Sequence, residues 1–576
     1  MSRLGAPLLL CLSVGLAPPC RADRLAELGV FERESVEAAL TELGLEVDNA
    51  PDGKRLGLVR VKNFEVFGEK DSSFLRWFNL FHRTTTEETI AREVLLRPGD
   101  RWDQERVDET VRNLQSPVYS NVIVAVPTRS AERDTVDLLI VTRDVWSLRF
   151  NSNIQFQGDS ITLLSFSLAE NNFLGWRKQM NVFFNMDQGA FEVGPAYVDP
   201  NILGTHLTLD SRASVIFGRD TLEAEGTRSA TTLEYPLWSL DQTLGGSVNV
   251  THYDSLVRSY QGSGVRTYDA PGTLGDDAIP WAYRYTYVEG SAKAKAAFGR
   301  GLKHLVSAGY EAYWLEASLP DDFAYTGVAR RQFEYVALPR GELSSALTAS
   351  YELYTPKYAT YRDFATYDLR EDYLVGPYFG YFVTQGLRAL GSDDTYTRVA
   401  TTLQVADSVG GAYLKASASW SARLEVGSLR DHRSTLSFYG ATPSLFSALR
   451  VVVRSDLSAW LSGENVGTYA LGGDSGLRGH SVGALNGSRR FRTNVELRSI
   501  PWRVWALRVG GVVFWDFGDA VNDLSDLAPV HDVGLGLRIL IPQFNTYVFR
   551  LDWAFATEGV EAGWPGRLSF GFLQAF

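Results

Sequence analysis

The stretch RVWALRVGGVVFWDFGD, residues 503–519, alternates in character from one residue to the next. Because successive side chains of a β-strand point to opposite sides, this alternation predicts a strand with two distinct faces. One face is apolar and aromatic and consists of Leu507, Val509, Val513, Trp515 and Phe517. The other face consists of Arg508, Gly510, Phe514 and Asp516. The sequence therefore predicts a long strand that carries charge on the side opposite its aromatic side chains.

The same alternation continues from Val145 to Phe576, where helical periodicity disappears. It recurs in DVGLGLRILIP (532–542), NTYVFRLDWAFA (545–556) and the terminal stretch GRLSFGFLQAF (566–576). On the terminal stretch one predicted face carries Leu568, Phe570, Phe572 and Phe576. A soluble sheet would bury such apolar faces and a transmembrane barrel would turn them to lipid, so alternation alone does not separate the two folds.

Three further features favour an all-β transmembrane barrel. The predicted strands are longer than the usual five or six residues of globular sheets. Short turns such as IPQF alternate with long loops at 257–281, 317–332 and 461–487, as periplasmic turns and extracellular loops do. The last strand is amphipathic up to Phe576. Residues 146–576 leave room for about 16 antiparallel strands of ~10 residues each. The alternating runs number roughly twenty, so some of them would be loop hairpins.

The first 22 residues are typical of a secretory signal peptide. They contain Arg3, an apolar run at 6–17 and the ending CRA, a small-x-small cleavage site. A lipoprotein cysteine at Cys20 is the competing interpretation, although the preceding LAPP matches it poorly. Both cysteines, Cys11 and Cys20, lie in this segment. The mature chain would therefore have no thiol and no zinc-type ligand set, and we expect neither a metal nor a cofactor.

Composition and charge further limit the kinds of protein that the chain could be. The formal net charge is -12, which removal of the signal would make -14, so nucleic acid is not an expected partner. The chain contains 14 Trp, 26 Tyr and 31 Phe, together with 52 Gly. After the signal, no apolar run approaches the roughly 18 residues of a transmembrane helix.

The region before the barrel has a mixed pattern. TTTEETIAREVLL (84–96) and DQERVDETVRNL (103–114) show helical spacing behind the capping residues Thr86 and Asp103. Strand-like runs at 58–68, 120–127 and 134–146 flank them. A small α+β domain at 55–145 is therefore predicted. Residues 23–54 indicate one further short helix but not a complete second domain.

The order β-α-α-β-β, with LLRPGDRWDQERVDETVRNL joining the helices, resembles a polypeptide-transport-associated (POTRA) domain. The loop 461–487 contains GLRGHS, and FWDFG follows at 514–518. These motifs and the terminal strand resemble the BamA/TamA superfamily of outer-membrane assembly and translocation proteins. The family's loop motif corresponds here to Leu477, Arg478, Gly479 and His480, and its FxDxG motif to Phe514, Asp516 and Gly518. His480 departs from the family's usual aromatic residue at that position.

The resemblance implies that Arg478 contacts acidic residues on the inner wall of the barrel. Asp516 has inward parity, and on the neighbouring predicted strand Glu496 shares a face with Arg492 and Asn494. A guanidinium is planar and always charged, so it can engage two carboxylates at once. The terminal residues Leu568, Phe570, Phe572 and Phe576 would form the signal by which such barrels are recognised for insertion.

The letters GDSG at 473–476 invite a competing interpretation, a serine-hydrolase nucleophile at Ser475. A hydrolytic serine needs a histidine base and an orienting carboxylate, whereas the seven histidines are scattered along the chain. Gly, Asp and Ser are also common turn residues. We therefore expect no catalytic residue and no enzymatic activity.

Two functional classes remain open on the sequence. In the first, the protein sits in the outer membrane of a Gram-negative bacterium with its POTRA-like domain in the periplasm, and assists insertion of proteins into that membrane or their translocation across it. Its partners would be the lipid bilayer, unfolded or extended client polypeptides that add to a sheet edge, and accessory periplasmic proteins. In the second, it is a passive or gated pore with a periplasmic docking domain. An arginine loop that fills the lumen would separate them, because a freely conducting pore does not need one.

Overall fold

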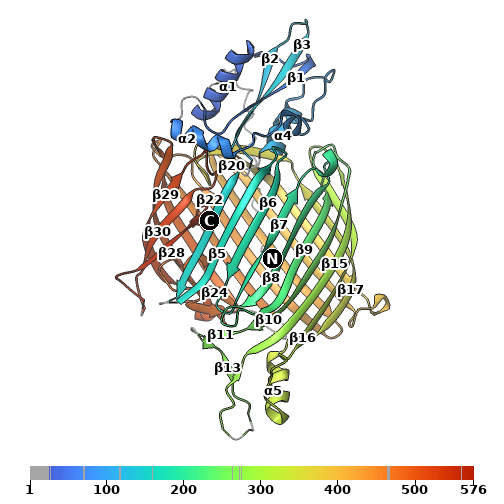
Figure 1. Ribbon diagram of the computed structural model, residues 1–576, viewed down its shortest axis with the longest axis vertical. Coiled ribbons are helices and arrows are strands. Elements are labelled where there is room, and N and C mark those ends of the chain that lie inside the picture. Colours follow the sequence, from blue (N-terminus) through green and yellow to red (C-terminus); the bar gives the residue numbers. More distant parts are fainter. Residues whose placement is uncertain are drawn as a thin grey trace, which may run out of the picture.

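The computed structural model describes residues 25, 28–68, 72–115, 119–157, 160–261, 264–271, 273, 275–462, 468–559 and 561–576. These residues form a small α+β domain at one end of a large β-barrel (Figure 1). The expected signal peptide 1–22 lies outside the described residues. In the part of the chain that is described, no helix has both the length and the apolar character required to cross a membrane.

The α+β domain is built on a three-stranded sheet in the order β1-β3-β2. β1 is parallel to β3, and β2 is antiparallel to it. The elements of the domain are α1 (Val30–Leu43), β1 (Arg55–Phe64), α2 (Ser73–Trp77), η1 (Phe78–Phe81), α3 (Glu87–Ala91), α4 (Gln104–Leu114), β2 (Ser120–Arg129) and β3 (Thr135–Asp144). α4 begins at the cap predicted for it, because the Asp103 carboxylate accepts hydrogen bonds from the Glu105 and Arg106 N–H groups. α3 is shorter than its apolar spacing indicated and ends at Ala91, and the Leu95 N–H donates to the Thr110 hydroxyl instead.

Helices cover both faces of this sheet. One core contains Ile90 and Val111 from α3 and α4 together with Leu138. The opposite core contains Val36 and Ala39 from α1, packed on residues of β2 and β3. The segment 23–54 thus contributes the helix that covers the second face of the sheet.

We expect a fragment of residues 28–144 to melt at a higher temperature than residues 55–144. The shorter fragment lacks α1 and leaves Val122, Val124 and Leu139 of the sheet uncovered. Burying a side chain of this size contributes about 1.5–3 kcal/mol. Thermal melts followed by circular dichroism compare the two fragments. Equal midpoints would mean that α1 does not stabilise the sheet.

The barrel is a closed ring in which the successive strands from β4 to β31 pair antiparallel, and β31 and β4 are neighbours where the ring closes. Its strands are β4 (Leu148–Gln157), β5 (Ser160–Phe173), β6 (Lys178–Met186), β7 (Ala190–Asp199), β8 (Thr208–Gly218), β9 (Ala224–Tyr235), β10 (Leu244–Arg258), β15 (Ala282–Phe298), β16 (Lys303–Ser318), β17 (Glu342–Tyr354), β18 (Lys357–Arg362), β19 (Arg370–Gly386), β20 (Tyr396–Val409), β21 (Ala412–Glu425), β22 (Ser428–Ala441), β23 (Leu449–Ser462), β26 (Arg489–Ser499), β27 (Trp502–Val504), β28 (Leu507–Val521), β29 (Val530–Leu540), β30 (Phe549–Ala556) and β31 (Arg567–Phe572).

Short elements occupy the connections. They are η2 (Ile202–Gly204), β11 (Tyr260–Gln261), β12 (Gly264–Val265), β13 (Thr267–Tyr268), β14 (Ile279–Pro280), α5 (Gly327–Ala337), η3 (Arg388–Leu390), β24 (Tyr469–Leu471), η4 (Gly473–Ser475), β25 (Leu485–Gly487) and η5 (Leu524–Asp526). α5 and β13 lie at the end of the barrel opposite the α+β domain (Figure 1).

The expectation of about 16 strands is not confirmed. Within the described residues the ring contains 22 strand segments. β17 and β18 pair one after the other with β19, and β26 and β27 do the same with β28, so the wall has twenty strands if each such couple is one interrupted strand. The count of alternating runs was the better guide than the estimate of 16, because several turns use very few residues and the runs set aside as loop hairpins are strands of the wall. Between β20 and β21, for example, only Gly410 and Gly411 intervene, with φ of 58° and 81°, the positive angles that a tight hairpin turn requires.

In β28 the side chains of 507–517 point alternately outward and inward, as the sequence predicts. Val513 and Trp515 are 53% and 44% exposed on the outer side, whereas Phe514 and Asp516 are 2% and 0% exposed. The aromatic face of the strand is thus the outer wall, and the charged face is turned to the interior.

The C-terminal residues differ from the expectation in one respect. β31 ends at Phe572, with Leu568 and Phe572 exposed on its outer face and Phe570 half-buried. Phe576 does not share that face. Leu573 has a positive φ of 75°, and beyond it Phe576 packs against the interior cluster that contains Tyr361 and Phe364. The Arg498 guanidinium lies 5.2 Å from the Phe576 ring and donates to its main-chain oxygen at 3.1 Å.

Candidate functional site

The segment between β23 and β26 folds back against the interior wall. β24 pairs with β25 to form its stem, and η4 precedes the GLRGH stretch. Leu477 is fully buried in a small cluster with Leu471 and Ala520. This apolar contact fixes the loop on β28 and places Arg478 among inward-facing carboxylates.

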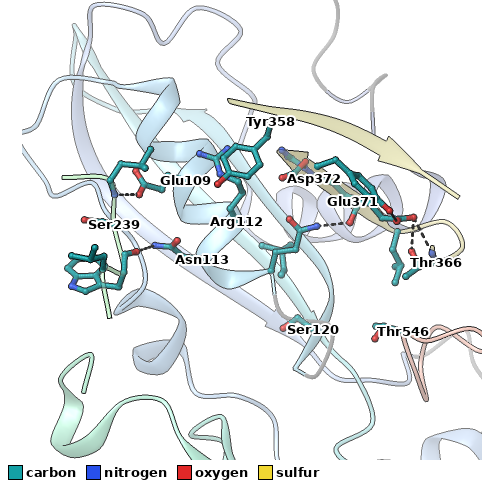
Figure 2. A pocket seen from close by; sticks show the side chains of 18 of the residues that line it. Glu109, Arg112, Asn113, Ser120, Ser239, Tyr358, Thr366, Glu371, Asp372 and Thr546 are labelled. Carbon is teal, nitrogen blue, oxygen red and sulfur yellow. Dashed lines mark hydrogen bonds and ion pairs between the residues drawn. The ribbon is translucent and has the colours of Figure 1, made fainter. Parts of the chain in front are cut away.

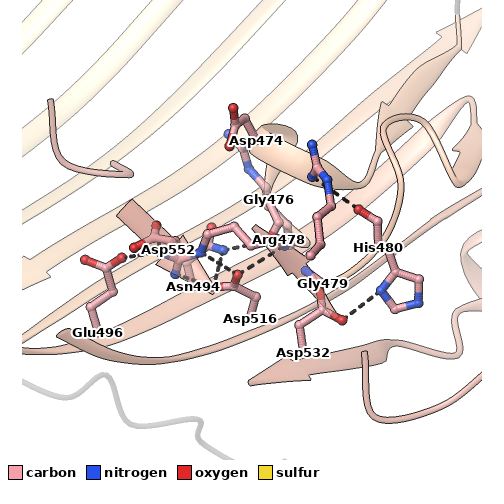
Figure 3. A network of polar contacts seen from close by, with 12 residues as sticks. Asp474, Gly476, Arg478, Gly479, His480, Asn494, Glu496, Asp516, Asp532 and Asp552 are labelled. Atoms are coloured by element: carbon pink, nitrogen blue, oxygen red, sulfur yellow. Dashed lines mark hydrogen bonds and ion pairs between the residues drawn. The ribbon is translucent and has the colours of Figure 1, made fainter. Parts of the chain in front are cut away.

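Arg478 is the centre of a buried ion network (Figure 3). Its Nε and Nη2 atoms donate to the two carboxylate oxygens of Asp516, each at 2.8 Å. Nη1 donates to Glu496 at 2.6 Å and to Asp552 at 3.1 Å. The Arg478 side chain is 3% exposed and its three carboxylate partners are 0% exposed. One guanidinium therefore joins three strands, β26, β28 and β30, by charge-assisted hydrogen bonds.

Phe514, on the same strand as Asp516, also contacts the Arg478 guanidinium. The centre of its ring lies 3.5 Å from the Arg478 Cζ atom. A guanidinium held over an aromatic face gains a further electrostatic attraction. Both signature residues of β28 therefore contact the same cation.

The next two residues of the motif bind a different acid. The Gly479 N–H donates to Asp532 at 2.6 Å, and the His480 Nδ1 atom lies 2.7 Å from the other oxygen of the same carboxylate. His480 thus contacts β29 through a polar ring where the family pattern has an aromatic one.

Two glycines of the motifs are required by close packing. A Cβ atom on Gly479 would lie 2.5 Å from the main-chain nitrogen of Ala556, and one on Gly518 would lie 2.5 Å from the Phe491 carbonyl oxygen. Real Cβ atoms do not approach backbone that closely. Glycine therefore lets the loop and the wall approach each other at these two positions.

Sequence reasoning named Glu496 and Asp516 as partners of Arg478, and the structure brings all three together. It did not name Asp552 as a further partner of Arg478, nor Asp532 as the partner of Gly479 and His480, although both have inward parity. It placed Asn494 on the inner face but assigned it no contact. Asn494 donates to Asp516 at 2.8 Å and to the Gly476 carbonyl at 2.7 Å. The alternation indicates that these side chains point inward. Neither the alternation nor the motif indicates which inward side chains the loop contacts.

A second layer of arginines surrounds these carboxylates. Arg538 donates to Asp552 at 2.5 Å, and Arg498 donates to Glu496 at 2.7 Å. Arg538 is fully buried and Arg498 is 4% exposed. The buried carboxylates are therefore shared between an arginine of the loop and arginines of the wall. These cations offset the free-energy cost of removing the carboxylates from water.

Ser475 is held in a turn. Its hydroxyl donates to the Gly472 carbonyl at 2.7 Å, and its own carbonyl accepts a hydrogen bond from Arg492. The His480 ring pairs with Asp532. In the described residues, no group of three or more His, Cys, Asp or Glu side chains could hold a metal ion.

We expect Ser475→Ala to leave activity and stability almost unchanged. The substitution removes one hydrogen bond to the backbone of a turn, worth about 0.5–1.5 kcal/mol. A client-assembly assay and a thermal melt of the purified protein provide the measurement. Abolished activity in a folded variant would reopen the hydrolase interpretation.

A second segment, the β18–β19 hairpin at 357–375, lies across the end of the barrel nearest the α+β domain. β18 pairs with β19 from Lys357 opposite Val375 to Arg362 opposite Arg370. At its tip Phe364 and Tyr367 are 1% and 3% exposed. Asp368 forms an ion pair with Arg508 of β28, which is separated from β19 in the ring by β20, β21, β22, β23 and β26. The hairpin therefore reaches across the interior rather than lying on the rim.

This hairpin connects the arginine network with the α+β domain. Arg498, which binds Glu496, also donates to the Phe364 carbonyl at 3.0 Å. At the base of the tip, Arg362 forms an ion pair of 2.5 Å with Glu32 of α1. A path of polar contacts and hairpin backbone thus runs from Arg478 to α1.

A cavity of 690 Å³ separates α4 and β2 from the barrel mouth (Figure 2). Asn113 donates to the Trp238 carbonyl at 2.9 Å, and Gln115 donates to the Arg370 carbonyl at 2.6 Å. Glu109 accepts a hydrogen bond from the Leu240 N–H, and burial raises the pKa of this carboxyl. The domain therefore docks on the turn 236–243 and on the β18–β19 hairpin, with a polar space between these contacts.

One comparison with a curated protein bears on the resemblance. A curated protein of Treponema pallidum (strain Nichols), described as "Putative outer membrane protein assembly factor", is 27% identical over 132 residues. The chain is similar to an outer-membrane assembly factor. The match spans 22% of this chain and 16% of that relative. It confirms the resemblance predicted from the sequence and the outer-membrane location.

Solved structures give further likenesses. CdiB from Escherichia coli matches over 90% of this chain and 76% of its own, at 11% identity and a TM-score of 0.44. BamA from Haemophilus ducreyi lacking POTRA domains 1–3 matches over 90% and 84%, at 13% identity and a TM-score of 0.32. No protein-family model matches the chain.

Proposed function

We propose that this outer-membrane protein assists the insertion of proteins into the outer membrane or their translocation across it. The observation that carries the proposal is Arg478, buried on a folded-back loop and bound to Glu496, Asp516 and Asp552 on three strands of the inner wall. A loop anchored in this way ties together β26, β28 and β30, the strands that precede β31. It therefore braces the last part of the barrel, beside the junction at which the ring closes.

The α+β domain supports the proposal as a POTRA-like periplasmic domain that would receive extended client segments and accessory periplasmic proteins. Its order of β1, α3, α4, β2 and β3 is the expected one, with α2 and η1 inserted after β1. β1 and β2 are the edges of the sheet. Val47 already pairs with Thr128 on β2, so part of that edge is occupied by the chain itself. Residues 99–102 pair with the beginning of β1, so a client strand would add to the rest of that edge by main-chain hydrogen bonds.

The junction of β31 and β4 is the proposed place of client engagement in the membrane. β31 has six residues, which limits the ladder it can form on either side. A cavity of 340 Å³ near its end is lined by Phe150 of β4, Phe549 of β30 and Phe572 of β31. Sheet strength depends on cross-strand pairs, and a short strand provides few of them.

A passive pore is the alternative, and the interior contacts argue against it. Both the Arg478 loop and the β18–β19 hairpin extend across the interior. We expect the purified protein in planar bilayers to show low and infrequent conductance. A large and steadily open channel would favour the pore.

Photocrosslinking tests the proposal directly. A photoreactive residue at Phe150, 62% exposed on β4, should trap client polypeptides in cells. The matched control is Leu347, 50% exposed on β17 on the far side of the ring. We expect client adducts at Phe150 and none at Leu347. Equal trapping at both positions, or none at Phe150 in a functional variant, would contradict the proposed site of engagement.

A further inference from the structure

The helical segment Ser73–Phe81, formed by α2 and η1, exposes large apolar side chains. Phe74 is 69% exposed, Trp77 52%, Leu80 76% and Phe81 55%. These four residues lie within a single run of nine residues. Contiguous apolar surface of this kind marks a binding surface for protein or membrane.

Phe78, whose ring contacts those of Phe74 and Trp77, fixes the segment to the barrel. Phe78 packs in an aromatic cluster with Phe67, Trp146 and Phe544. Its ring lies 5.2 Å from that of Trp146 and 5.5 Å from that of Phe544. Trp146 lies two residues before β4, and Phe544 lies in the turn between β29 and β30. The exposed residues are therefore held at the domain end of the barrel, where α2 lies (Figure 1). They are next to the junction of β31 and β4, because β31 is flanked by β30 and β4 in the ring.

The segment continues a belt of apolar residues at this end of the barrel. On one side, Trp505 in the turn between β27 and β28 is 96% exposed. On the other, Trp176 in the turn between β5 and β6 is 47% exposed and Leu203 in the turn between β7 and β8 is 96% exposed. Aromatic residues gather at the two lipid–water boundaries of transmembrane barrels. The exposed face of α2 and η1 lies between these turns.

We propose that the face formed by Phe74, Trp77, Leu80 and Phe81 inserts into the membrane leaflet on the domain side of the barrel and fixes the α+β domain against the bilayer beside the β31–β4 junction. The proposal rests on the outer-membrane location of the barrel and not on the transport activity. An amphipathic segment of this type lies in the interface plane with its apolar face among the acyl chains.

The charge of the segment fits this occupant. Residues 72–83 contain Arg76 and Arg83 and no acidic residue, in a chain whose formal net charge is -12. Both arginines are on the exposed surface. Cations beside an apolar face favour the phosphate groups of lipid headgroups.

Site-directed spin labelling of the full chain in lipid nanodiscs tests the proposal. Cys11 and Cys20, the two cysteines of the sequence, are replaced by Ser, and one nitroxide is attached at Leu80→Cys. We expect the Leu80 label to collide with oxygen more readily than with a water-soluble nickel complex. The lipid reference is Leu168→Cys, at a position 54% exposed on the outer wall of β5, and the water reference is Ala131→Cys in the exposed turn between β2 and β3.

A Leu80 label with the accessibility ratio of Ala131 would overturn the proposal. That outcome would mean that the apolar face does not enter the bilayer and stays in water when no protein partner is present. Since a nanodisc of the purified protein contains no such partner, the face would then be assigned to one. Phe81→Cys gives a second position if the Leu80 variant folds poorly, and both changes leave Phe78 in its cluster. A label at Phe81 must also have the lipid-side ratio for the proposal to stand.

Discussion

Arg478→Ala should give a barrel that still forms but has lost most of its activity, with the loop 461–487 open to proteolysis. The substitution leaves Asp516, Glu496 and Asp552 without the cation that all three share. Truncating one partner of a buried ion pair typically costs about 3–5 kcal/mol. Anchoring of the loop would then weaken on the order of 100-fold or more, since each 1.4 kcal/mol is tenfold. Strand pairing in the wall does not depend on this contact, so heat-modifiable migration of the folded barrel should persist.

Charge reversal tests whether the pairing itself matters. Arg478→Asp alone places a fourth carboxylate among three and should be more defective than Arg478→Ala. Adding Asp516→Arg restores one pair at the same place, and we expect it to recover part of the activity. Ser475→Ala is the matched control, because it changes the same loop without touching the network. Full activity of Arg478→Ala would remove the principal residue-level support for the proposed function.

The sequence predicted the barrel wall well because lipid on one side and a charged interior on the other impose a strict period of two. The parity of Val513, Phe514, Trp515 and Asp516 is that of the structure. The number of strands was underestimated because some of the alternating runs were taken for loop hairpins, whereas turns as short as Gly410–Gly411 join strands of the wall directly. The prediction that Phe576 shares the outer face was wrong. The alternation was extended to the last residue, whereas the positive φ at Leu573 changes the direction of the chain before it.

The candidate site was predicted only in part, for a physical reason. A motif locates Arg478 and parity locates the inward carboxylates, but which of these meet depends on how the strands are staggered around the ring. Asp552 on β30 reaches Arg478 from 74 residues away. The β18–β19 hairpin was not foreseen at all, since its sequence reads as two ordinary alternating runs and its inward course is fixed by tertiary contacts with Arg450, Arg498 and Arg508.

Shortening this hairpin should convert a closed barrel into a conducting one. Replacement of residues 363–369 by Asn-Gly joins Arg362 and Arg370, which are already register partners, through the turn type that suits two-residue hairpins. The change removes Phe364 and Tyr367 from the interior together with the Asp368–Arg508 ion pair. It also removes the Asp363 carbonyl that accepts from Arg450 and the Phe364 carbonyl that accepts from Arg498, so these guanidinium groups should hydrate and admit water at this end. We expect frequent, long openings in planar bilayers where the unchanged protein shows few.

The matched control removes an element of similar size at the other end of the barrel. Deletion of α5, which packs in a separate cluster around Phe333, should leave conductance unchanged. If the shortened hairpin stays closed while its barrel remains folded, the Arg478 loop alone must seal the interior. A double variant with Arg478→Ala separates the two barriers. Opening only in the double variant would mean that the hairpin and the loop close the interior independently, and that the contact between Arg498 and Phe364 does not couple them.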